Sequence, residues 1–223
     1  MFGAVAVGET PRIVGVISTV AAFDSLDEFP CDIVEVRLDK LGAPEGWLER
    51  CLQIEAAGKP VLLTLRSRSE GGDWPADKPR LRIFGEAMPL SAIDVELRSD
   101  ADLDAARIAR HFGKPCVLSY HNFQQTPPLE ELEAIVAQAE HLGGVTKIAA
   151  KVQSDADAAI LKALLQVPRR QPLCVIGMGE DRAELRIELA RLGSCLAYGY
   201  LDTSAAPGQI SAAELSKALT LPF

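Results

Sequence analysis

The sequence predicts an α/β protein, a single (β/α)8 TIM barrel that spans residues 1–223. Eight short apolar, β-branched runs alternate with amphipathic stretches along the chain, which is the pattern of strands and helices in turn. The runs begin about every 20 to 32 residues, the spacing of a βα unit, and eight such units make a barrel. No GxGxxG fingerprint follows the first run, so the alternative, an open doubly wound sheet, is disfavoured.

Each element is expected from its own periodicity. The expected strands, in chain order, are 13–18, 32–38, 60–66, 92–97, 115–121, 145–150, 172–177 and 195–200. The expected helices are 46–57, 101–112, 129–142, 155–166 and 180–192. Several of these helices begin with acidic residues, which suit the helix dipole, and Asp100 is a predicted N-cap. The first connection, around 24–29, is short and only weakly helical.

Composition narrows the range of partners and locations. Lys and Arg number 23 against 31 Asp and Glu, and the formal charge of −8 disfavours nucleic acid and anionic membranes as partners. No apolar run approaches the ~20 residues of a membrane span, and no basic start precedes an apolar stretch, so neither a membrane segment nor a secretory signal is expected. The five cysteines are scattered without a CxxC pair, which is typical of reduced thiols in the cytoplasm.

Polar side chains recur at alternate positions of several expected strands. The residues that share a parity are Glu35 and Arg37, Thr64 and Arg66, Asp94 and Glu96, Ser119 and His121, with Lys147 on the sixth run. If that parity faces the barrel axis, these groups converge toward the C-terminal ends of the strands, where barrel active sites are built. Buried charges are costly, so a set gathered there must pair, bind an anion or perform chemistry.

Each of these residues also has an ordinary structural explanation. Arg66 could be an ion-pair partner at a strand end, and His121 could be a buried histidine with satisfied hydrogen bonds. Lys147 could point outward, although lysine is rarely buried without a reason. Their joint occurrence on successive strands favours a functional site.

The chemistry of this set points to an enzyme that needs no cofactor. A neutral lysine amine can attack a carbonyl to form an imine, and a histidine can move protons near neutral pH. Arginines bind a substrate carboxylate. The chain has no P-loop, no HExxH and no close His/Cys cluster, so neither a nucleotide nor a metal is expected. We therefore predict a lysine-dependent enzyme that acts on a small carboxylated carbonyl compound.

The same residues carry a family resemblance over nearly the whole chain. The matching stretches, in order, are VEVRLDK at 34–40, TLRSRSEGG at 64–72, IDVEL at 93–97, SYHNF at 119–123, TKIAAKVQS at 146–154, IGMGE at 176–180 and APGQIS at 206–211. In these stretches the chain resembles the type I 3-dehydroquinate dehydratases of the shikimate pathway. The resemblance implies dehydration of 3-dehydroquinate to 3-dehydroshikimate through a lysine imine on a (β/α)8 barrel, and a homodimer.

The resemblance also implies roles for individual residues. Lys147 forms the imine, His121 shuttles protons, and Glu70 orients and tunes His121. The implied substrate-binding residues are Glu35, Arg37, Arg66, Arg186, Gln209, Ser204 and Met178. Arg186 binds the substrate carboxylate, with Arg182 as an alternative. A hydroxyl residue usually precedes APGQ, but this chain has Ala205 there, so Ser204 is its substitute or a hydrogen bond is lost.

Two other functions stay open at this point. A lysine-imine aldolase or transaldolase would share the lysine but would need a phosphate site after strands seven and eight, where this chain has APGQ. A barrel that only binds a ligand is the other alternative. Glu70, His121 and Lys147 argue against it, whereas Ala205 leaves it open.

Overall fold

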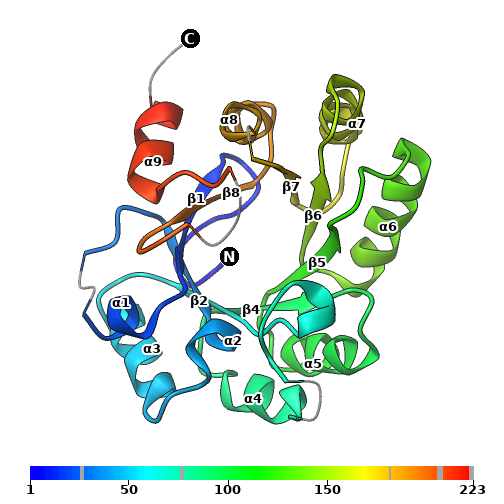
Figure 1. Ribbon diagram of the computed structural model, residues 1–223. Helices are drawn as coiled ribbons and strands as arrows, with labels where there is room; N and C mark the ends of the chain where they lie inside the picture. The colour runs from blue at the N-terminus through cyan, green and yellow to red at the C-terminus, as the bar shows by residue number, and fades with distance from the viewer. Residues whose placement is uncertain (26–27, 76–77, 181, 205–207, 221–223) are drawn as a thin grey trace.

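A computed structural model describes residues 1–25, 28–75, 78–180, 182–204 and 208–220. Eight parallel strands form a nearly closed barrel, with helices around its outside, as predicted (Figure 1). The strands are β1 (Arg12–Ile17), β2 (Ile33–Arg37), β3 (Val61–Thr64), β4 (Ala92–Glu96), β5 (Cys116–Asn122), β6 (Val145–Lys151), β7 (Leu173–Met178) and β8 (Leu196–Tyr200). Every expected strand therefore overlaps an observed one.

The helices follow the prediction closely where the amphipathic pattern is long. The helices are α1 (Val20–Ser25), α2 (Leu38–Leu41), α3 (Trp47–Ala56), η1 (a 3-10 helix, Arg68–Glu70), α4 (Arg80–Glu86), α5 (Asp100–His111), α6 (Leu129–Leu142), α7 (Asp155–Gln166), α8 (Ala183–Arg191) and α9 (Ala212–Thr220). The sequence reading missed α2, η1, α4 and α9, most of which are too short to show a period. The predicted N-cap, Asp100, is wrong by one residue, because the Ser99 side chain accepts the bond from the Asp102 N–H.

The barrel is joined by backbone ladders along all pairs of neighbouring strands except β7 and β8. Its order is β7-β6-β5-β4-β3-β2-β1-β8, so those two strands are the ends. Across this seam the Cys195 N–H donates to the Leu173 carbonyl (2.9 Å). The buried Ser194 hydroxyl accepts from the Val175 N–H (2.9 Å) and donates to the Leu196 carbonyl (3.1 Å). A serine side chain thus completes part of the ring that a backbone ladder would otherwise close.

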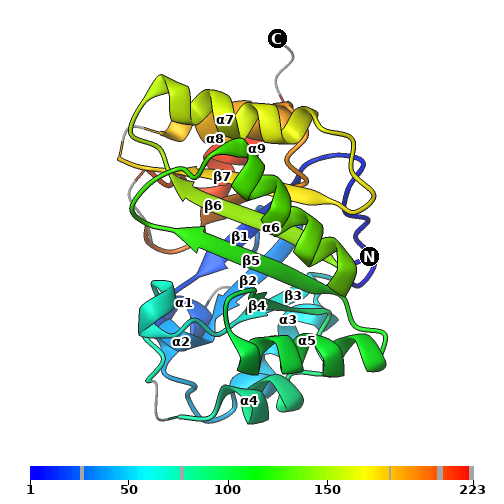
Figure 2. The same cartoon turned by 90° about the vertical axis from the view of Figure 1, so that its right-hand side faces the viewer.

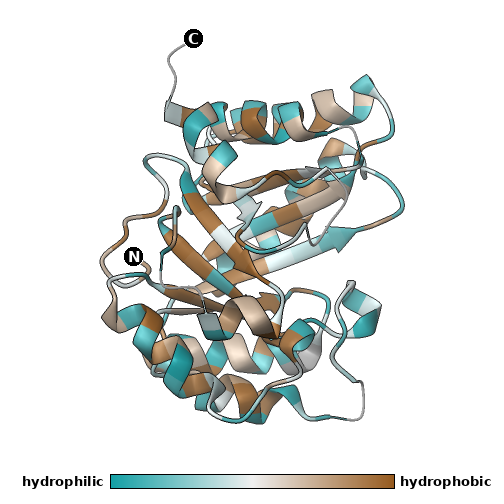
Figure 3. Cartoon of the chain, turned by 60° about the vertical axis from the view of Figure 1, so that its left-hand side comes forward, coloured by the Kyte–Doolittle hydropathy of each residue, from teal (hydrophilic) through white to brown (hydrophobic). Residues whose placement is uncertain are grey.

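Two large apolar cores hold the barrel, and a small third cluster of Ala190, Ala197 and Leu215 packs α8 and α9 against β8. The larger core lies between the strands and the helices. Figure 3 shows hydrophobic residues along the strands and hydrophilic residues on the outer helices. The second core fills the N-terminal end of the barrel interior with Phe2, Val14, Ile33, Leu62, Ala92, Val117 and Val145. Figure 1 shows the N-terminus in the middle of the ring. Because this end is filled by apolar side chains, polar groups that point inward gather at the opposite end.

The strand register places the polar side chains on one interior face. Thr64 is opposite Asp94, and Ser119 is opposite Lys147. His121 lies one step further along β5, opposite Ala149, toward the C-terminal ends of the strands. Figure 2 shows β5 and β6 side by side with their arrowheads at the same end. Within the described ranges, no helix has the length and apolar character needed to cross a membrane.

Candidate active site

A cavity opens at the C-terminal ends of the strands. All but one of the site residues implied by the sequence line it: Glu35, Arg37, Arg66, Glu70, His121, Lys147, Met178, Arg186 and Gln209. The exception is Ser204, which is exposed and is not among the described residues that line the cavity. Ala205, the residue expected to weaken a substrate contact, lies outside the described residues. Lys151 ends β6 and is exposed, so its amine is not a second group in this cavity.

Asp94 is the buried anion at the floor of the site. Its Oδ2 accepts from Lys147 Nζ (3.1 Å), and its Oδ1 accepts from the Ser119 hydroxyl (2.6 Å) and pairs with Arg66. Burial by itself would raise the pKa of Asp94, but Arg66 and Lys147 outweigh it and lower this pKa to about 2. Asp94 therefore stays ionised and holds two buried cations in place.

Lys147 lies between this carboxylate and an aromatic ring. Its side chain is nearly buried, at 5% exposure, and its Nζ lies 4.4 Å from the centroid of the Tyr198 ring. Tyr198 also lines the cavity, and its buried hydroxyl has no hydrogen-bond partner in the part of the chain that the structure describes. Sequence reasoning missed Tyr198, although a tyrosine inside the apolar run of the eighth strand was a usable signal.

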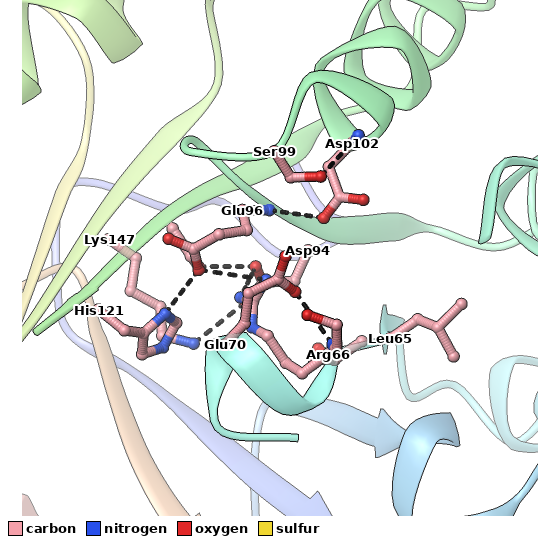
Figure 4. Close-up of polar contacts among 12 residues, drawn as sticks. Leu65, Arg66, Glu70, Asp94, Glu96, Ser99, Asp102, His121 and Lys147 are labelled. Carbon is pink, nitrogen blue, oxygen red and sulfur yellow. Dashed lines mark hydrogen bonds and ion pairs between the residues drawn. The ribbon is translucent and has the colours of Figure 1, made fainter. Parts of the chain in front are cut away.

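His121 is held by Glu96 on one side and Phe123 on the other. Its Nδ1 lies 2.8 Å from Glu96 Oε2, and its ring stacks on Phe123 with centroids 5.7 Å apart (Figure 4). Burial, together with Arg66 and Lys147, lowers the pKa of His121 well below its usual value. Burial raises the pKa of Glu96 to about 7, against the attraction of Arg66. The histidine is therefore neutral near pH 7 and its ring is fixed in orientation.

The contact expected between Glu70 and His121 is replaced by one with Arg80. Arg80 donates from Nη1 to Glu70 Oε2 (2.5 Å) and from Nη2 to Oε1 (3.0 Å). The Ser67 N–H also donates to Oε2 (3.0 Å), completing a capping box at the start of η1. The planar guanidinium forms two parallel hydrogen bonds with a carboxylate, so Arg80 binds both oxygens of Glu70. Glu70 still lines the cavity, but Glu96 is the carboxylate on His121.

The loop that carries Glu70 folds back over Arg66. Its Gly71 has a φ of +77°, and an added Cβ there would lie 2.4 Å from Phe123 Cζ. At Gly72 an added Cβ would lie 2.3 Å from the Arg66 Cβ. The two glycines are therefore required for the turn to pack against both side chains.

Of the two arginines proposed for the substrate carboxylate, Arg186 faces the cavity. Arg186 lies on α8, and its buried Nε has no hydrogen-bond partner among the described residues. Burial lowers its pKa to about 10. Arg182 is the N-cap of the same helix and does not line the cavity. A buried guanidinium without an acidic partner is a binding site for an anion.

The other polar residues at the rim are paired within the protein. Arg37 donates from Nε and Nη2 to Asp39 (2.9 and 2.7 Å), and the Thr64 hydroxyl donates to Glu35 Oε1 (2.6 Å). Among the described residues, no three His, Cys, Asp or Glu side chains are arranged to hold a metal ion. The site thus combines a buried amine, a neutral imidazole and an arginine ready for an anion. This combination suits attack on the carbonyl of a small carboxylate.

Comparisons with known proteins point to one family. The family model for type I 3-dehydroquinase matches residues 16–223. A 3-dehydroquinate dehydratase of Methanothrix thermoacetophila is 36% identical over 192 residues, 84% of this chain and 80% of that protein. One from Methanocella arvoryzae is 30% identical over 92% of this chain and 95% of its own. The crystal structure of the Aquifex aeolicus 3-dehydroquinate dehydratase superposes with a TM-score of 0.81 and 31% identity, over 92% of this chain and 96% of that one.

Proposed function

The chain belongs to the type I 3-dehydroquinase family, and from this we propose that it dehydrates 3-dehydroquinate to 3-dehydroshikimate through an imine on Lys147. The observation that carries the proposal is the cavity itself, which Lys147 and a neutral His121 line together with Arg186, whose Nε has no hydrogen-bond partner among the described residues. The substrate has the matching groups, because it is a small carboxylate with a ketone. The reaction removes water across the α and β carbons of that ketone, taking a proton from C2 and the hydroxyl from C1.

Substrate binding follows from the charges. The substrate carboxylate sits on Arg186, whose buried guanidinium has no acidic partner among the described residues. The ketone then lies toward Lys147, which lines the same cavity. Glu35 and Arg37 are placed to bind hydroxyl groups, and Gln209 and Met178 contact the substrate from the rim. An anion held in this way is oriented for reaction as well as bound.

The imine forms first. The Lys147 ammonium passes a proton to His121, and the amine then attacks the ketone carbon to give a carbinolamine. His121 returns that proton to the departing hydroxyl, so loss of water gives a protonated imine. Asp94, 3.1 Å from Lys147 Nζ, holds the amine in place and balances the positive charge that the imine carries. His121 is the side chain beside the lysine that can move protons during these steps (Figure 4).

Elimination follows from the acidity of the carbon next to the imine. His121 takes a proton from C2, and the electron pair moves into the protonated imine to give a neutral enamine. The enamine electrons then return to form the C1–C2 double bond as the C1 hydroxyl leaves, and His121 gives its proton to that hydroxyl as water departs. Hydrolysis of the imine releases the conjugated product and restores the Lys147 amine.

A cytoplasmic location is part of the same proposal. It is supported by five cysteines that are buried and unpaired in the structure. Free thiols persist in reducing compartments. Biosynthetic enzymes that act on small metabolites also belong there.

Borohydride trapping tests the proposed function. The protein with 3-dehydroquinate and borohydride is expected to gain one reduced adduct on Lys147, located by peptide mass spectrometry. Lys147→Ala should give no adduct and should not produce the conjugated enone seen by ultraviolet absorbance. His121→Ala should slow turnover by about 10²- to 10⁴-fold, the usual worth of a general acid–base residue. A Lys147→Ala variant with full dehydratase activity would contradict the proposal, and carbon–carbon cleavage of a sugar phosphate would favour an aldolase.

A further inference from the structure

Among the residues that the structure describes, the His121 ring has one carboxylate partner, and it comes from the neighbouring strand. Glu96 ends β4 and is nearly buried, at 3% exposure. Its Oε2 is 2.8 Å from His121 Nδ1, a distance that requires a proton shared between the two atoms. Figure 4 shows this contact directly beside Lys147. Any proton transfer by His121 therefore takes place with Glu96 attached to its far nitrogen.

Glu70 is not available for the same contact. Both of its oxygens are bound by Arg80, and Arg80 also donates to the Ser99 hydroxyl (2.9 Å) and lies 3.1 Å from Asp102 Oδ1. Freeing Glu70 would leave the Arg80 guanidinium, whose side chain is 12% exposed, with fewer acidic partners. Breaking a largely buried pair of this kind is costly.

We propose that Glu96 is the positioning residue for His121, orienting the ring and stabilising its protonated form during turnover. This inference rests on the proposed function, because it concerns the same proton shuttle. The sequence resemblance assigned this role to Glu70, and the inference assigns it to Glu96. Glu96 is not among the described residues that line the cavity, so it acts through the histidine.

The protonation of the pair explains why the identity of the partner matters. With Glu96 ionised, His121 donates its Nδ1–H to the carboxylate and leaves Nε2 unprotonated, so that Nε2 can take the substrate proton. With Glu96 protonated, the carboxylic acid donates to Nδ1, the ring proton moves to Nε2, and the base is lost. The imidazolium that forms after proton abstraction is then stabilised only in the first case.

The charges around Glu96 decide at which pH this change occurs. The charged or titratable groups that face it are Arg66 (3.7 Å), Asp94, Glu70, His121 and Lys147, and its backbone N–H donates to Asp102. Burial raises the pKa of Glu96 to about 7, and Asp94 and Glu70 raise it further while Arg66 and Lys147 oppose them. The ionised, active form of the pair is therefore lost as the pH falls through about 7.

Kinetics of Glu96→Gln test the inference, because the amide keeps the shape and removes the titration. For the wild type, kcat/KM should fall about 10-fold from pH 8 to pH 6. Glu96→Gln should lose about 10-fold in kcat at pH 8, with KM unchanged, and its profile should be flat over this range. Asp104→Asn, which removes an exposed carboxylate paired with Arg107, is the control and should match the wild type.

Nitrogen-15 NMR of the histidine rings provides a test that needs no substrate. The chain has three histidines, so His121 can be assigned with a single His121→Asn variant. The wild type and Glu70→Gln should carry the ring proton on Nδ1 at pH 8, whereas Glu96→Ala should shift it to Nε2. If Glu96→Ala does not fold, Glu96→Gln serves in its place and should give a mixture of the two forms.

The outcomes separate this inference from the proposed function. Loss of the Nδ1–H signal in Glu70→Gln but not in the Glu96 variants would overturn the inference, as would a Glu96→Gln profile that keeps the wild-type acid limb. Absence of a borohydride adduct on wild-type Lys147 would instead overturn the proposed function. The NMR result is independent of that trapping experiment, so one can fail while the other holds.

Discussion

Arg80 holds both carboxylate oxygens of Glu70, at 2.5 Å (Nη1–Oε2) and 3.0 Å (Nη2–Oε1). The pair joins α4 to η1, and through Ser99 and Asp102 it also joins them to the start of α5. The segment that covers one side of the cavity is thus tied to two helices. Glu70 therefore has a structural role that is separate from the chemistry of His121.

The first prediction concerns the contribution of the Arg80 ion pairs to the free energy of unfolding. Arg80→Ala should lower the free energy of unfolding by about 3 kcal/mol, since it leaves Glu70 and Asp102 without their cation in a poorly solvated place. Arg82→Ala is the matched control from the same helix. Its exposed i,i+4 pair with Glu86 should contribute less than about 0.5 kcal/mol. Urea unfolding at unchanged m-value measures both, and equal losses in the two variants would contradict the prediction.

The barrel was predictable from the sequence because its signals are local. Strands such as 115–121 alternate polar and apolar residues, and helices such as 129–142 repeat over several turns. The same alternation placed Asp94, Glu96 and Lys147 on one interior face, which the register confirms. The period of a helix and the parity of a strand depend only on the local sequence, so both can be predicted without knowing the tertiary contacts.

The partner of His121 was not predictable, because it depends on packing between distant segments. Glu70 and Glu96 both point toward the same region, and only the position of Arg80 decides which one is free for the histidine. Arg80 begins α4, a helix of seven residues that the sequence pattern did not reveal. Ser204 is not among the described residues that line the cavity, and the position of such a loop residue could not be predicted because a residue period does not encode loop conformation.

The second prediction concerns the pH dependence of the contribution of Asp94. Its pKa is about 2 in the folded protein, below the value of 3.8 for an ordinary aspartate. Its stabilising effect is therefore complete above pH 3.8 and is lost as the pH falls through about 2. Asp94→Asn should cost about 3 to 5 kcal/mol at pH 7, because Arg66 and Lys147 stay buried without an anion. The gap between wild type and variant should narrow on acidification. A gap that widens toward pH 3 in urea unfolding would contradict this.

The third prediction concerns the unsatisfied hydroxyl of Tyr198. Tyr198→Phe keeps the ring under Lys147 and removes a buried group without a hydrogen bond, so the protein should gain about 1 kcal/mol in stability. Tyr120→Phe is the opposite case, because that hydroxyl accepts from Arg98 Nη2 (3.2 Å), and it should lose about 1 kcal/mol. If the Tyr198 hydroxyl binds substrate, kcat/KM should fall about 10-fold in Tyr198→Phe. Thermal unfolding and steady-state rates of the two variants check both signs.

The last prediction separates binding from stability at Arg186. Arg186→Met removes a buried guanidinium that lacks an acidic partner among the described residues and whose pKa burial lowers to about 10. The variant should therefore be more stable than the wild type by about 1 kcal/mol, since an apolar side chain fits a desolvated position better than an unpaired charge. Its KM for 3-dehydroquinate should rise at least 100-fold, because the substrate carboxylate loses a bidentate partner. Arg182→Met removes a cation from the same helix outside the cavity and should leave KM unchanged.

A KM change in Arg182→Met that matches or exceeds the one in Arg186→Met would place the carboxylate on Arg182. A loss of stability in Arg186→Met would show that the guanidinium is paired in solution. Because stability and KM are expected to move in opposite directions, misfolding of the variant cannot imitate the result.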